Sequence, residues 1–101
     1  MNSQSKTNWS EDEYINHLKM ERKLYSWCLV NYGNFTHKDA EKEALNFYKY
    51  ESEENEYRGL VFHDESWHWA MIKIYGEKYW INKPELSSPS KEYDLESKKL
   101  L

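Results

Sequence analysis

The feature that most constrains the fold of this chain is a helix-initiation signal followed by a long amphipathic stretch. Glu13 follows Ser10 by three positions, which is the spacing of a capping box, in which each side chain binds the other residue's backbone N–H. Large apolar residues then recur at helical spacing, within one narrow arc of a helix. The arc holds Tyr14, Leu18, Tyr25, Leu29 and Tyr32, with Asn16, Lys19, Lys23 and Ser26 opposite. We therefore predict a helix over residues 11–32, ended by a left-handed Gly33.

A second helix-initiation signal follows after a short linker. Thr36 can cap this helix, and Asp39 lies three positions later. Because the linker is short, the two helices are expected to form an antiparallel hairpin. We expect the second helix to end near Tyr50, because the acidic run 51–56 would oppose the helix dipole there, and we predict this run to be an exposed loop. The inward-facing residues of this helix are predicted to be Ala40, Ala44, Phe47 and Tyr48.

From residue 57 onward the apolar residues alternate, which is typical of strands. The runs 57–63, 67–75 and 78–82 are predicted to form an antiparallel meander. Gly76 and Glu77 are a glycine-first pair that suits a type II′ hairpin turn between the last two strands. In that register one sheet face carries Trp67, Trp69, Met71, Lys73, Tyr75 and Trp80, and the other carries Ala70, Ile72, Ile74, Tyr79 and Ile81.

The predicted fold class is α+β, in a single domain over residues 9–86. Its two layers are an N-terminal helical hairpin and a three-stranded antiparallel β-meander, in the order α-α-β-β-β. Residues 1–8 are expected to form a flexible leader, and residues 87–101 a C-terminal tail or a short helix. Aromatic residues make up 17% of the 101 residues, and each can bury roughly 150–250 Å², so they could build a core although Val and Ile are few.

The net charge and the number of cysteines argue against several kinds of function. The net charge of −4 argues against nucleic-acid or anionic-membrane binding, which draws on clustered Lys and Arg. Cys28 is the single cysteine, which excludes an internal disulfide, and its place on the apolar arc predicts a core residue. The polar N-terminal residues and the lack of a long apolar run predict a soluble, cytoplasmic protein. Abundant Lys, Asn, Glu and Tyr suggest an AT-rich genome, of a bacterium or a phage.

No stretch of the sequence matches a motif of catalysis or phosphate binding. A P-loop, a dinucleotide-binding glycine turn and a GxSxG elbow are all missing, and the chain has three glycines in total. We therefore predict a non-enzymatic protein without a cofactor, although an unusual enzyme stays open. The favoured function is a small interaction module of regulatory, inhibitor or immunity type, whose partner is another protein or a second copy.

The predicted partner-binding surface is the aromatic face of the sheet. One helical hairpin can cover one side of a sheet, and the exposed side would then be rich in the residue types that binding surfaces concentrate. Alternation does not identify the buried side, so this face could instead be the core, or be covered by the C-terminal segment or a second copy. The residues are Trp67, Trp69, Met71, Tyr75 and Trp80.

The alternative prediction is a metal-binding or small-ligand-binding site, and possible minor enzyme, at the tip of the first hairpin. If the loop has two residues, His63 and His68 face each other with Asp64 and Glu65 nearby. Two imidazoles and a carboxylate can bind zinc, and a histidine beside a carboxylate can act as a general base. If the loop has an odd number of residues, the histidines point to opposite faces and the site disappears.

Overall fold

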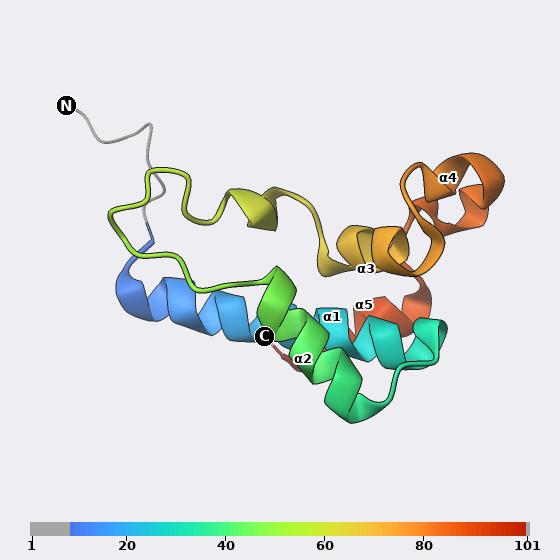
Figure 1. The fold of residues 1–101 in the computed structure, drawn as a ribbon, viewed down its shortest axis with the longest axis horizontal. Helices are drawn as coiled ribbons and strands as arrows, with labels where there is room; N and C mark the ends of the chain where they lie inside the picture. Colours follow the sequence, from blue (N-terminus) through green and yellow to red (C-terminus); the bar gives the residue numbers. More distant parts are fainter. Residues whose placement is uncertain (1–8, 101) are drawn as a thin grey trace.

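The computed structural model describes residues 9–100 and contains only helices and loops in that range (Figure 1). The predicted leader at residues 1–8 lies outside the described residues. Among the described residues, no helix has both the length and the apolar character needed to cross a bilayer. In chain order the elements are α1 (Glu11–Gly33), α2 (His37–Phe47), the 3₁₀-helix η2 (Leu60–His63), α3 (Ser66–Tyr75), α4 (Tyr79–Asn82), the 3₁₀-helix η3 (Pro84–Ser87) and α5 (Lys91–Lys99).

The first predicted helix is confirmed as α1, and it starts with the predicted capping box. The Glu13 backbone N–H donates to Ser10 Oγ at 3.1 Å, and the Ser10 backbone N–H donates to Glu13 Oε1 at 3.0 Å. The left-handed residue that ends α1 is Asn34, with φ of 60°, and not Gly33. Gly33 instead allows a close approach of α3, because an added Cβ would lie 3.0 Å from Ile74 Cγ1, which would have to shift.

The second predicted helix is confirmed as α2, and it packs against α1. Thr36 caps it, since its Oγ1 accepts from the Asp39 N–H at 3.1 Å. The helix ends at Phe47, earlier than predicted, where an α1 side chain takes over the exposed carbonyl. Arg22 donates from Nε and Nη2 to the Tyr48 carbonyl oxygen at 2.8 and 2.6 Å. The predicted loop at 51–56 is confirmed as irregular, and it is exposed except for the half-buried Glu51.

The predicted α+β class is wrong, because the described residues contain no strand. The second predicted strand is α3, on which Trp67, Ala70 and Met71 are buried at helical spacing. Nearly every position from Trp67 to Tyr75 is apolar or aromatic, so this run satisfies the alternating and the helical pattern at once. Packing against α1 stabilises the helical alternative.

The glycine that suggested a hairpin turn instead ends α3. Gly76 has φ of 96°, and its N–H donates to the Ile72 carbonyl at 2.8 Å. Both a type II′ turn and a helix C-terminus use the positive φ that glycine tolerates, so its presence cannot distinguish them. The third predicted strand is the short helix α4, and the first is a series of turns followed by η2.

The helix α1 is the centre of the molecule, and α2, α3 and α5 each contact it (Figure 1). The C-terminal segment forms a helix, α5, which Ser90 caps by accepting from the Tyr93 N–H at 3.1 Å. Aromatic residues supply the largest side chains of the core, and Cys28 lies within it, fully buried, as predicted. Its large members are Tyr14, Tyr25, Tyr48, Trp67, Tyr79 and Tyr93, packed with Leu18, Leu24, Leu29 and Met71.

Candidate functional site

The residues predicted to form an aromatic binding face do not share one surface. Without a sheet, alternation along the chain no longer places them on the same side. Trp67 and Met71 are buried in the core, with exposed fractions of 2% and 0%. Trp69 is half-buried, while Tyr75 and Trp80 are each 42% exposed.

The two histidines of the alternative prediction lie on different elements, and the hairpin that would have joined them is not formed. His63 ends η2 and is exposed, whereas His68 belongs to α3 and is half-buried. His68 Nδ1 lies 3.1 Å from the hydroxyl of Tyr79, and its ring is stacked 6.0 Å from that of Trp80. Within residues 9–100, no three His, Cys, Asp or Glu side chains are grouped so that they could hold a metal ion.

The structure brings together a cluster that the sequence did not predict, formed by the buried Ser66, Glu21 and Tyr48 and the half-buried His17. Ser66 Oγ hydrogen-bonds the Glu21 carboxylate and lies 3.2 Å from the Tyr48 hydroxyl. His17 Nε2 lies 3.3 Å from the other Glu21 oxygen. In a catalytic triad the histidine contacts the serine, whereas here the carboxylate separates them. Because Ser66 is also fully buried, this cluster joins helices and does not present a nucleophile.

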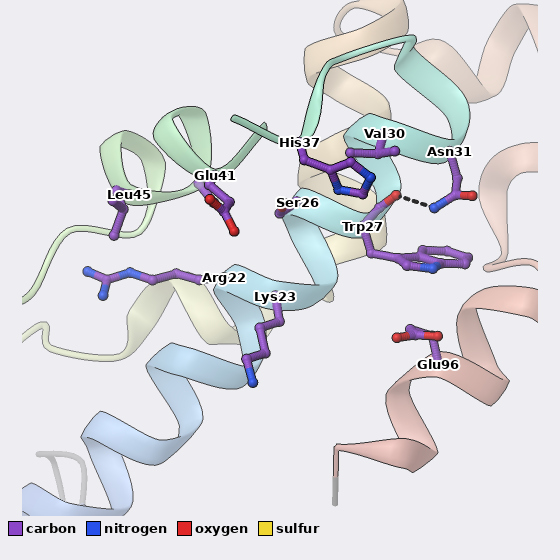
Figure 2. A pocket seen from close by; sticks show the side chains of 11 residues that line it. Arg22, Lys23, Ser26, Trp27, Val30, Asn31, His37, Glu41, Leu45 and Glu96 are labelled. Carbon is purple, nitrogen blue, oxygen red and sulfur yellow. Dashed lines mark hydrogen bonds between the residues drawn. The ribbon is translucent and has the colours of Figure 1, made fainter. Parts of the chain in front are cut away.

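A groove of about 470 Å³ lies between α1, α2 and α5 (Figure 2). The helix α1 supplies the floor, α2 forms one wall and α5 forms the other. The groove follows α1 because the contacts with α2, α3 and α5 leave this face of the central helix uncovered. The apolar part of the lining consists of Trp27, Val30, Ala44 and Leu45.

Two apolar side chains of the groove differ in their surroundings: Trp27 packs against other aromatic rings, whereas Leu45 is exposed. Trp27 is half-buried, and its ring lies 5.8 Å from that of Tyr32 and 6.4 Å from that of Tyr93. Leu45, on the α2 wall, is 56% exposed although it lies next to the buried Ala44. The groove therefore offers apolar surface that no part of the described chain covers.

Charged side chains are distributed unevenly around the groove. Arg22 and Lys23 lie at one end, and His37 lies at the other, near Val30 (Figure 2). Glu41 on α2 and Glu96 on α5 belong to opposite walls. The groove therefore combines a few apolar side chains, Trp27 and Val30 on α1 and Leu45 on α2, with a cationic end and an acidic side chain on each wall.

The groove could not be identified from the sequence. Lys23 and Ser26 lie opposite the apolar arc of α1, and the sequence gives no sign that a groove forms over this side of the helix. The second wall depends on where α5 packs, and the α5 sequence carries no signal for that position. Comparison of the chain with protein-family models, with curated proteins and with solved structures gives no match.

Proposed function

We propose that this protein is a non-enzymatic interaction module that receives an α-helical segment of a partner protein in the groove between α1, α2 and α5. The observation that carries this proposal is the uncovered face of α1. Three helices pack around α1, and between two of them, α2 and α5, a groove remains whose lining includes Trp27, Val30 and Leu45. This is the shape into which an amphipathic helix can place its apolar face.

The character of the groove residues supports a protein partner. Tryptophan is enriched among the residues that contribute most to binding energy, and Trp27 is held in place by two neighbouring rings. Leu45 would lose its exposed surface when a helix enters the groove. Burial of apolar surface contributes about 25 cal/mol per Å², so covering Leu45 and the floor favours association.

Site-specific photocrosslinking tests this proposal. The photoreactive amino acid p-benzoylphenylalanine would replace Leu45 in cells that naturally make the protein. Leu60 on η2 is a matched control, because it has the same exposed fraction of 56% and does not line the groove. We expect irradiation to give a discrete protein adduct at position 45 that is missing at position 60.

A groove-filling variant completes the test. Ser26 lies half-buried on the floor, so Ser26→Trp should occupy the groove and abolish the adduct at position 45 while the helical circular dichroism is kept. Equal adducts at positions 45 and 60, no adduct at position 45, or an adduct that persists with Ser26→Trp would each contradict the proposal.

A further inference from the structure

We infer that the helix bound in the groove is amphipathic and has a defined charge order, with a carboxylate over Arg22 and Lys23 and a basic side chain near Glu41. This inference rests on the proposed function and specifies the chemistry of the partner. The charge order would also fix the direction in which the helix lies along the groove.

The cationic end of the groove has no anionic partner within the described chain. Arg22 donates two hydrogen bonds to the Tyr48 carbonyl, at 2.8 and 2.6 Å, which hold its guanidinium at this end of the groove. Among residues 9–100, neither Arg22 nor Lys23 has a carboxylate within 4.0 Å. An apolar segment laid over this end would desolvate the Lys23 ammonium with no partner, and would leave the Arg22 guanidinium with only its carbonyl acceptor, which is costly. A partner carboxylate removes that cost.

The α2 and α5 walls carry the opposite charge. Within the described part of the chain, Glu41 has no basic side chain within 4.0 Å, whereas Glu96 lies 3.4 Å from Lys99 Nζ. A basic side chain of the partner therefore has an unpaired acceptor at Glu41. A helix with the reversed order would bring like charges together at both places, and such contacts disfavour wrong partners and wrong orientations.

Selection from a display library tests the inference directly. The library would present one helical peptide scaffold with a fixed leucine face, in which the positions flanking that face vary among Glu, Gln and Lys. Selection against the full chain should enrich peptides with Glu near one end and Lys nearer the middle. Selection against Lys23→Glu should replace the enriched Glu by Lys.

A matched charge change serves as the control. Lys42 is exposed on α2 and does not line the groove, so Lys42→Glu should enrich the same peptides as the unchanged protein. Peptides selected on the unchanged protein should bind Lys23→Glu at least about fivefold more weakly. The difference should shrink at high salt, because salt screens exposed charges.

The outcomes separate this inference from the proposed function. Enriched helices without a charge preference, or with the same preference for Lys23→Glu, would overturn the inference and leave the groove as a helix site. Failure to enrich any helix, or binding that Ser26→Trp does not reduce, would refute both. A dimeric mass for the free chain that Ser26→Trp returns to a monomer would assign the groove to a second copy and overturn the inference.

Discussion

At the scale of single residues, the polar side chains that this fold buries are paired with one another. Ser66, at the start of α3, contacts the Glu21 carboxylate of α1 and the Tyr48 hydroxyl that follows α2. In the described part of the chain, no buried side-chain nitrogen or oxygen lacks a hydrogen-bond partner. An unpaired polar group in the interior costs more free energy than a formed hydrogen bond contributes. Loss of the Ser66 hydroxyl should therefore lower the free energy of unfolding by more than the loss of its buried volume alone would.

Removal of that hydroxyl should destabilise the protein measurably. Ser66→Ala leaves Glu21 and Tyr48 each short of a partner, which should lower the free energy of unfolding by about 1–3 kcal/mol. Urea unfolding followed by circular dichroism gives the value. Ser88→Ala, at an exposed position, should change the same quantity by less than about 0.5 kcal/mol. Equal effects of the two substitutions would show that the buried cluster does not hold the helices together.

At the scale of elements, one arginine holds the long connection between α2 and α3 against α1. Arg58 is 3% exposed, and its Nη1 donates to Glu11 Oε1 at 2.7 Å and to the Glu51 carbonyl at 3.3 Å. Its guanidinium also lies 4.1 Å from the centroid of the Tyr14 ring. Arg58 thus links the irregular segment to both the first turn and the buried face of α1.

Loss of this arginine should free the connection while the helices remain folded. In Arg58→Met, digestion by a glutamyl endopeptidase should cleave after the exposed glutamates of 53–56 at least about fivefold faster, because local opening becomes more frequent. Lys49→Met, at an exposed residue nearby, should leave the cleavage rate unchanged. If Arg58→Met is cut no faster than Lys49→Met, the contacts of Arg58 do not restrain this segment.

Some helices of this fold could be predicted from the sequence, and others could not. The starts of α1 and α2 are set by Ser10 and Thr36, whose capping contacts span three residues, so they were predictable. The run that became α3 was not, because its apolar residues fit both periods and Gly76 suits both a turn and a helix end. The groove was least predictable, since its walls come from α2 and α5, which are far apart along the chain.

At the scale of the whole molecule, the core is built from groups that ionise at high pH. Burial raises the pKa of the phenols of Tyr25, Tyr48 and Tyr93 and of the Cys28 thiol. Desolvation is the main cause in each case, because the charged form is disfavoured away from water. These groups stay neutral in the folded protein at pH values where the unfolded chain loses their protons.

The protein should therefore become less stable as the pH rises above about 9. In the unfolded chain Cys ionises near pH 8.5 and Tyr near pH 10. Above these values the unfolded state binds fewer protons than the folded state, so the free energy of unfolding falls with pH. Urea unfolding at pH 7.5, 9.0 and 10.5 should show decreasing midpoints. At pH 10.5 the unfolded chain should show more phenolate absorbance than the folded protein, because the buried phenols ionise only after unfolding. Equal absorbance of the folded and unfolded protein would contradict this account.

The position of α5 has a consequence for protein synthesis. The wall that carries Glu96 is made after the rest of the groove, because α5 begins only at Lys91. A nascent chain still held in the ribosome, or one interrupted before that residue, has the floor and the α2 wall but lacks the opposite side. The groove between three helices can therefore exist only once translation has passed α5, and a ligand that required both walls would distinguish such a product from a truncated one.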